Sequence, residues 1–250
     1  MAWLIASRSC VTSSVSGRAR QLGSLTAKGV LFTLVFVLAP ALAQAAAPQK
    51  LAALTFDDGP YGQPTNQILT ILKAKQVPAA FFLIGNNAHQ HPALVARELA
   101  EGHIVENHSL DHAKNLSSLT PAALTKNIQS AEQIIADITG HKPALFRPPY
   151  GYTSPKMLAT LRKLGYTIVM WNDAPRDYQQ TATPDQIVSQ VMGELKPTAI
   201  IDLHDGRDVK INYPRQNIIA ALPKIIDGLR ARGYTLVRLD KLLKLKPYLS

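Results

Sequence analysis

The sequence predicts an α/β fold with a largely parallel sheet or barrel, because short β-branched or aromatic runs alternate with longer helical patterns after Pro48. No low-complexity linker interrupts this alternation. At 250 residues, with 46% hydrophobic and 18% charged residues, the chain can bury one sizeable core. We therefore expect one folded domain, over residues 50–245.

Seven runs rich in apolar and β-branched residues are candidate strands. They cover residues 51–56, 79–84, 103–107, 144–147, 166–171, 199–204 and 234–239. Seven parallel strands suggest a barrel one strand short of the common eight.

The helices between these strands begin with a hydroxyl residue that can cap the first turn, followed by proline at the first helical position. These pairs are Thr120 with Pro121, Ser154 with Pro155, and Thr183 with Pro184. The first of these helices has one apolar face and can end at Gly140. The face consists of Leu124, Ile128, Ala131, Ile135 and Ile138. We expect it to pack on the sheet.

Residues 1–43 have the pattern of a secretory signal peptide: a basic stretch, the apolar run 30–39, and small residues that fit cleavage after Ala43 or Ala45. The alternative is an uncleaved membrane anchor, because residues 30–47 approach the roughly 18 to 20 residues that a spanning helix needs. We expect an exported protein, periplasmic or extracellular. The single cysteine, Cys10, lies in this leader, so the mature domain has no disulfide and no thiol nucleophile.

The formal net charge is +10, and part of this excess lies in the leader, which contains no acidic residue. A moderately basic surface favours an anionic partner such as a cell-wall polymer, nucleic acid or lipid headgroups. Nucleic-acid binding would need a focused basic patch, and the lysines and arginines here are dispersed along the sequence. Nothing in the sequence implies a stable protein partner.

Polar residues suited to catalysis lie at the ends of four predicted strands. Asp57 and Asp58 follow the first strand, His108 follows the third, Arg147 ends the fourth and His204 ends the sixth. In a parallel barrel these strand ends share one rim, so we expect the side chains to converge there.

Asp57 and Asp58 are consecutive carboxylates before a Gly59-Pro60 turn. Successive side chains of a strand face opposite sides, so one carboxylate could bind a cation while the other reaches a neighbouring water. The alternative interpretation is a common Asp-Gly turn.

His108 and His112 are spaced at i and i+4, which brings them to one face if the segment turns helically. Two histidines and one aspartate make a three-ligand set with an open position, suited to a catalytic divalent metal such as zinc. Such a pair is also common as surface decoration. Asp111, between them, is expected to be a solvated loop acid.

Residues 147–151 form a stiff segment in which two prolines follow Arg147, and this stiffness can aim the backbone N–H of Tyr150 at a developing oxyanion. The alternative is a loop with an arginine salt bridge. His204 is placed to act as a general acid, unless it is a structural histidine. No function is expected for the remaining histidines, His89, His91, His103 and His141.

Taken together and in this order, residues 55–59, 108–112, 147–151 and 203–206 resemble the motif series of polysaccharide deacetylases. This is carbohydrate esterase family 4, which includes chitin, chitooligosaccharide, peptidoglycan and acetylxylan deacetylases. The resemblance covers about residues 51–239. It implies a distorted (β/α) barrel of about seven parallel strands, whose domain removes acetyl groups hydrolytically from an N-acetylated polysaccharide or oligosaccharide.

The resemblance also implies a role for each matching residue. Asp58, His108 and His112 would hold a divalent metal, with zinc as the first choice and cobalt or manganese as alternatives. Asp57 would be the catalytic base and His204 the acid.

Three further residues would support this chemistry. Arg147 would contact Asp57 and favour its ionised, proton-accepting form. Tyr150 would supply the oxyanion N–H, and the metal would acidify its water and polarise the acetyl carbonyl. Asp177 matches the aspartate that supports the acid histidine.

The sequence departs from the family pattern at two places. Where the family commonly has Trp-x-x-Asp-x-x-Asp-Trp, residues 171–178 place Ala174 and Tyr178 instead of an aspartate and an aromatic wall residue. Asp202 stands where an apolar residue is usual, two positions before His204. These departures bear on the substrate more than on the chemistry.

Two other functions remain as alternatives. One is a carbohydrate-binding protein with impaired catalysis, against which stands the retention of Asp57, Asp58, His108, His112 and His204. The other is an O-deacetylase, or a metal-dependent hydrolase of another acyl group or cyclic amide on the same fold. The export signal disfavours a small cytosolic metabolite as the substrate.

Overall fold

The computed structural model describes residues 49–179, 181–206 and 215–249. The described residues all belong to one compact unit, residues 46–250. The predicted signal peptide therefore lies outside them. Within the described residues, no helix is both long and apolar enough to cross a membrane.

Within the described ranges, seven strands form one sheet, which includes β1 (Lys50–Asp57). Its order is β5-β4-β3-β2-β1-β6, and β7 also pairs with β1, next to the start of that strand. The other strands are β2 (Ala79–Leu83), β3 (Ile104–Asn107), β4 (Leu145–Phe146), β5 (Thr167–Ile168), β6 (Thr198–His204) and β7 (Tyr234–Leu236). Every neighbouring pair is parallel, which confirms the predicted α/β fold; β4, β5 and β7 are shorter than expected.

The two ends of the curled sheet meet where the segment after β5 reaches β6. Asp173 and Ile201 form a parallel bridge, and the Asp202 N–H donates to the Asp173 carbonyl at 2.9 Å. These contacts close the sheet into the expected distorted barrel.

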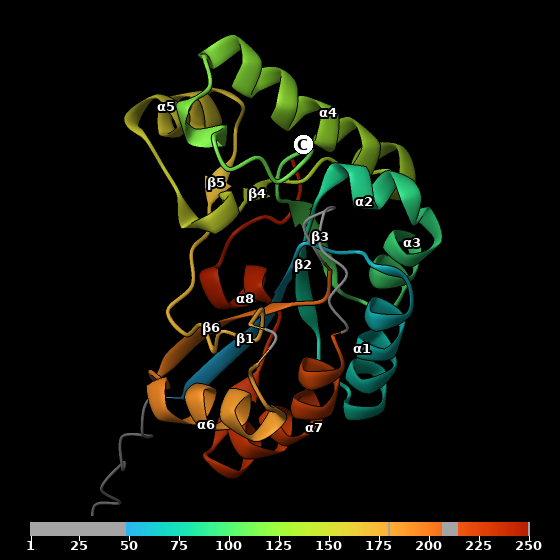
Figure 1. The fold of residues 1–250 in the computed structure, drawn as a ribbon, viewed down its shortest axis with the longest axis vertical. Coiled ribbons are helices and arrows are strands. Elements are labelled where there is room, and N and C mark those ends of the chain that lie inside the picture. The colour runs from blue at the N-terminus through green and yellow to red at the C-terminus, as the bar shows by residue number, and fades with distance from the viewer. Residues whose placement is uncertain (1–48, 180, 207–214, 250) are drawn as a thin grey trace, which may run out of the picture. The chain divides into compact units, whose positions relative to one another are not determined.

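Helices cover the outside of the sheet, except for the last one, in which Leu239 packs with Ala53 and Phe82 on the inner side (Figure 1). They are α1 (Gly62–Lys75), α2 (Gly85–Gln90), α3 (Pro92–Ala100), α4 (Pro121–Thr139), α5 (Pro155–Lys163), α6 (Pro184–Glu194), α7 (Gln216–Ala231) and α8 (Leu239–Leu243). Short 3₁₀ turns cover Leu116–Ser118 and Pro149–Gly151.

The predicted helix boundaries are confirmed. The side chains of Thr120, Ser154 and Thr183 each accept a hydrogen bond from a backbone N–H of the first helical turn, and Thr183 completes a capping box. Gly140 ends α4 in the left-handed conformation, at φ 74°. The apolar face of α4 packs as expected, because Leu124 and Ile128 lie in one buried cluster with residues of and near β4 and β5.

Side chains alternate across β1 and divide the core into two sides. Leu54 and Phe56 face the outer helices, in the large buried cluster that also contains residues of α1, α6 and α7. Ala53 faces the barrel interior, in a smaller cluster with Phe82 of β2. Thr55 and Asp57 are two and four residues after Ala53, so they also face the barrel interior. The interior face of β1 therefore changes from apolar to polar toward the carboxyl end of the strand.

Candidate active site and metal centre

The carboxyl ends of the strands bring the predicted residues to one rim, as expected. In the register of β1 with β6, Asp57 lies opposite His204. His108 follows β3, and its N–H donates to the carbonyl of Leu83 on β2 at 2.9 Å. Arg147 follows β4 and donates its N–H to the carbonyl of Asn107 at 3.1 Å.

Asp58, His108 and His112 form a buried cluster in which one potential ligand atom of each lies within 4.8 Å of the others. The Oδ1 atom of Asp58 is 3.5 Å from Nε2 of His108 and 3.3 Å from Nε2 of His112. Among the described residues, this buried oxygen has no hydrogen-bond partner. One carboxylate and two imidazoles match the donor set of a catalytic divalent site, so the cluster fits a metal ion.

Two further features of the cluster suit metal binding. His108 Nδ1 lies 2.7 Å from the Arg147 carbonyl, which can only accept, so Nδ1 carries a proton, and Nε2, which faces Asp58, is the nitrogen that would ligate a metal once it is deprotonated. Burial opposes ionisation of Asp58, but the interactions with His108 and His112 outweigh it and hold the pKa of this carboxyl below its usual value. The carboxylate is thus held in its ligating form.

The two histidines do meet, but not through the helical turn that their spacing allowed. Ser109 and His112 have φ of 77° and 54°, so the segment is a loop that turns through left-handed conformations. Side chains brace it: Asn107 Oδ1 accepts the Ser109 N–H at 2.8 Å, and Ser109 Oγ accepts the His112 N–H at 3.1 Å. The resulting ring centroids lie 5.0 Å apart. Asp111 is exposed and pairs with Asn127, as a loop acid.

Arg147 is fully buried, and one of its nitrogens contacts residues of two strands, β1 and β6. Its Nη1 lies 2.8 Å from Thr55 Oγ1, 2.8 Å from Asp57 Oδ1 and 2.9 Å from Asp202 Oδ1. The other oxygen of Asp57 faces the metal ligands, 3.7 Å from His108 Nε2. Burial and the charge of Asp57 raise the pKa of Asp202 to about 7, against the opposing effect of Arg147.

His204 is held by Asp177 at two points. Its backbone N–H donates to one carboxylate oxygen and its Nδ1 lies 2.8 Å from the other. Burial disfavours the charged imidazole, but the Asp177 carboxylate outweighs it and raises the pKa of His204 to about 10. Tyr178 packs its ring edge-on to the imidazole, with centroids 5.5 Å apart.

Tyr150 lies beside the metal cluster. Its backbone is left-handed, at φ 57°, within the turn after Pro149, and its ring centroid is 4.4 Å from that of His112. The stiff segment therefore places this residue next to the proposed ligands.

Thr55, Asn87, Asp205 and Gly206 support the site; three of them stand within the matching motifs, but no role was predicted for any of the four. Asn87 Nδ2 donates to the Asp58 carbonyl at 2.7 Å, and Asp205 accepts from the Thr65 hydroxyl. A Cβ on Gly206 would lie 2.0 Å from the Asp58 carbonyl oxygen, so only glycine fits there. Thr55 could have been found from the sequence, because it lies two residues before Asp57 on β1 and so faces the same side. The other three residues depend on contacts between distant segments.

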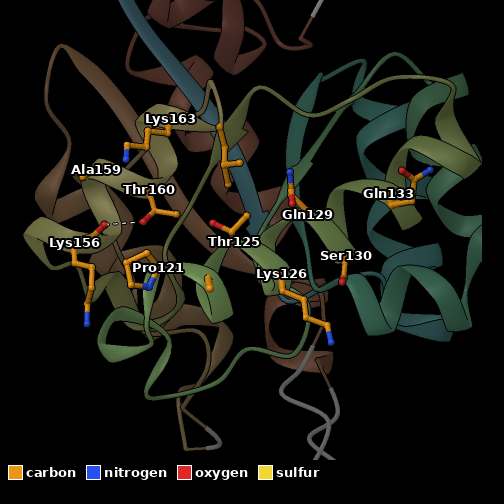
Figure 2. A pocket seen from close by; sticks show the side chains of 12 residues that line it. Pro121, Thr125, Lys126, Gln129, Ser130, Gln133, Lys156, Ala159, Thr160 and Lys163 are labelled. Carbon is orange, nitrogen blue, oxygen red and sulfur yellow. Dashed lines mark hydrogen bonds between the residues drawn. The ribbon is translucent and has the colours of Figure 1, made fainter.

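A separate cavity of about 790 Å³ lies between α4 and α5 (Figure 2). Lys126, Lys156 and Lys163 are among its lining residues, which include no acidic side chain. None of the candidate catalytic or metal-binding residues lines it.

Comparisons with known proteins agree with this geometry. Residues 44–169 match the sequence profile of a family described as Polysaccharide deacetylase. The chain is 34% identical to a peptidoglycan-N-acetylglucosamine deacetylase of Bacillus cereus, over 79% of this chain and 90% of that protein. It is 36% identical to a chitooligosaccharide deacetylase of Bradyrhizobium sp., over 76% of this chain and 89% of that protein.

The fold is similar to that of a solved peptidoglycan N-acetylglucosamine deacetylase, in complex with 4-naphthalen-1-yl-N-oxidanyl-benzamide. The TM-score is 0.76 at 31% identity, covering 80% of this chain and 91% of the other. The sequence, the fold and the arrangement of polar residues at the rim support the same family assignment. The chain belongs to the polysaccharide deacetylase family.

Proposed function

We propose that this protein is a metal-dependent hydrolase that removes acetyl groups from N-acetylglucosamine residues of a peptidoglycan or chitin-like glycan. The observation that carries this proposal is the arrangement of Asp57 and His204 opposite each other on β1 and β6, beside the buried cluster of Asp58, His108 and His112. A base, an acid and a metal site at one rim can together catalyse the hydrolysis of an amide.

The metal proposed for the cluster is zinc, because two imidazoles and one carboxylate with an open position are typical of catalytic zinc sites. Cobalt and manganese are the alternatives, since both accept the same donor atoms. When bound, the ion supplies Lewis-acid activation of the water and the acyl oxygen.

The residues of the chain then carry the proton transfers. Asp57 takes a proton from the attacking water through Oδ2, while Oδ1 stays paired with Arg147. The oxyanion that develops on the acyl carbon is met by the backbone N–H of Tyr150. His204 gives its Nε2 proton to the departing nitrogen, and the carbon–nitrogen bond breaks to yield acetate and an amine.

His204 is suited to the role of acid by its contact with Asp177. Because that carboxylate raises the pKa of His204 to about 10, the imidazole carries its proton at neutral pH. The Nδ1 proton stays on the Asp177 side at 2.8 Å, which leaves Nε2–H as the donor toward the substrate.

The substrate class is drawn from the relatives. One is described as a peptidoglycan-N-acetylglucosamine deacetylase and another as a chitooligosaccharide deacetylase. Both names specify an N-acetylated amino-sugar glycan, so the amide, rather than an acetyl ester, is the bond proposed for this chain.

The test is acetate release from chitooligosaccharides, peptidoglycan fragments and acetylxylan, with and without a chelator. We expect acetate from the first two, lost with the chelator and restored by added zinc. Release from acetylxylan alone would replace the proposal with an O-deacetylase. Failure of all three with metal bound would favour a carbohydrate-binding protein.

The proposed location is outside the cytoplasm, periplasmic or extracellular, with residues 1–43 removed and residues 50–245 acting as the catalytic domain. The support is the signal-peptide pattern of the leader. Mass spectrometry of the exported protein should find an N-terminus near Gln44 or Ala46. Full-length protein recovered with the membranes would instead support an anchor.

A further inference from the structure

Asp202 lies one layer below the acid and base inside the barrel. In the register of β1 with β6, Thr55 is opposite Asp202 and Asp57 is opposite His204. Side chains two residues apart on a strand face the same side, so all four face the interior. Asp202 is nevertheless only 5% exposed, and burying a carboxylate is costly unless it is paired.

Its partner comes from the segment after another strand, β4. Arg147, after β4, has its guanidinium carbon 4.2 Å from the centroid of the Phe82 ring and 5.5 Å from that of Trp171. Its Nη1 carries two hydrogens and faces three acceptors, on Thr55, Asp57 and Asp202. Asp202 therefore shares with Asp57 the nitrogen that contacts the proposed base.

The other terminal nitrogen of the guanidinium, Nη2, is the atom that could pair with the second oxygen of Asp57. Among the described residues, Nη2 of Arg147 has no hydrogen-bond partner, although it is buried. An unsatisfied buried donor next to a carboxylate favours the two-nitrogen, two-oxygen pairing that arginine commonly makes. Such a pairing with Asp57 would engage Oδ2, the oxygen that faces the metal ligands.

We propose that Asp202 is a positioning residue that holds Nη1 of Arg147 toward β6 and so keeps the guanidinium from closing on both oxygens of Asp57. Oδ2 of Asp57 is thereby left to accept the proton of the attacking water. The inference rests on the proposed deacetylase function. Asp202 itself touches no reacting atom.

Two substitutions at Asp202 separate positioning from packing. Asp202→Asn keeps one acceptor oxygen, whereas Asp202→Leu keeps none and introduces the kind of apolar side chain usual at this position in the family. We expect kcat to fall from wild type to Asn to Leu, by about tenfold in the Leu variant, with KM within about twofold. The Tm of the Leu variant should stay close to that of wild type, because Arg147 keeps Asp57 as a buried partner of opposite charge.

Asp173→Asn is the matched control. This aspartate is also buried, next to Asp202 through a backbone hydrogen bond, and its carboxylate oxygens have no hydrogen-bond partner within the described part of the chain. The hydrogen bonds of Arg147 Nη1 go to Thr55, Asp57 and Asp202, and not to Asp173. The kcat of this control variant should remain within about twofold of wild type.

A double-mutant cycle with Arg147→Met tests whether Asp202 acts through Arg147. The methionine keeps an apolar stem against Phe82 and removes the guanidinium. If Asp202 acts through Arg147, adding Asp202→Asn to Arg147→Met should change kcat by less than about twofold. An equal loss of kcat from Asp202→Asn in both backgrounds would overturn the inference.

Other outcomes are also decisive. Folded Asn and Leu variants with wild-type kcat would overturn the inference and leave the proposed function standing. Loss of kcat and Tm together in the Leu variant would show a packing role and overturn it as well. No acetate from the wild-type protein would instead overturn the proposed function.

Discussion

The metal side and the acid–base side of the site are built in different ways. Asp58, His108 and His112 lie on loops beyond the strand ends, and Asp58 and His112 both have positive φ. Asp57 and His204 lie on β1 and β6, in positions fixed by the register of the sheet. The metal side thus depends on unusual backbone conformations held by local hydrogen bonds, and the acid–base side depends on strand pairing and buried charge.

This difference predicts that the two sides fail separately. Substitutions on the loops should change metal affinity while leaving proton transfer intact. Substitutions on the strands and their charge partners should change rate and pH dependence while leaving the metal in place.

The largest effect is expected from removing two proposed ligands. The double variant Asp58→Ala, His108→Ala leaves one residue of the three-residue cluster, too few to hold a divalent ion tightly. Metal content after dialysis should fall to background and acetate release should be lost. Circular dichroism should show the fold intact. Wild-type metal content in this variant would contradict the assignment of the cluster.

A smaller loss is expected from His204→Ala, which removes the proposed acid. The value of kcat should fall by about 10² to 10³ on an N-acetyl sugar, the scale for a positioned acid or base. Metal content should be nearly unchanged, because His204 is outside the cluster. The natural amide must be used, since an aryl acetate has a good leaving group that needs little protonation. Near-normal kcat would make His204 a structural residue.

Asp177→Asn should move the pH dependence rather than abolish activity. His204 must be protonated to act as an acid, so its raised pKa, about 10, extends activity to alkaline pH. Without the Asp177 charge the pKa of His204 falls and the alkaline limb of kcat/KM moves toward neutral pH. The pH profile of the variant measures this shift directly. An alkaline limb that does not move would show that Asp177 does not tune the acid.

The smallest effect is expected on the metal side, from Ser109→Ala. This change removes the hydroxyl that accepts the His112 N–H at 3.1 Å. Residue 109 must still adopt a positive φ of 77°, which is unfavourable for alanine. Metal affinity should fall by about threefold to tenfold, the scale of one hydrogen bond. At saturating metal, kcat and the pH profile should match wild type. Zinc titration against a competing chelator provides the measurement, and a shifted pH profile would break the separation of the two sides.

The two sides also differ in how far the sequence could predict them. Residue types and strand ends placed Asp57, Arg147 and His204 at one rim correctly, because parallel strands end at the same edge. The i and i+4 spacing of His108 and His112 brings them together if the segment is helical, but the segment is a loop. Positive φ at residues other than glycine leaves no clear pattern in a sequence.

The contact of Asp202 with Arg147 was beyond the sequence for another reason. It depends on the register of β1 with β6, which are separated by more than a hundred residues in the chain. The alternation of Asp202 with Leu203 along β6 shows on which face of the strand Asp202 lies. It does not show which residue of another strand lies opposite Asp202. Tertiary pairing alone supplies that information.

Titration of metal-free protein with zinc, with acetate release from a chitooligosaccharide measured at each step, tests the joint action of both sides most directly. Activity should rise from background in proportion to added zinc and level off at about one ion per chain, the capacity of a single three-ligand cluster. Full activity before any zinc is added would contradict a metal-dependent mechanism. Stoichiometric zinc binding without acetate release would contradict the assignment of Asp57 and His204 as base and acid.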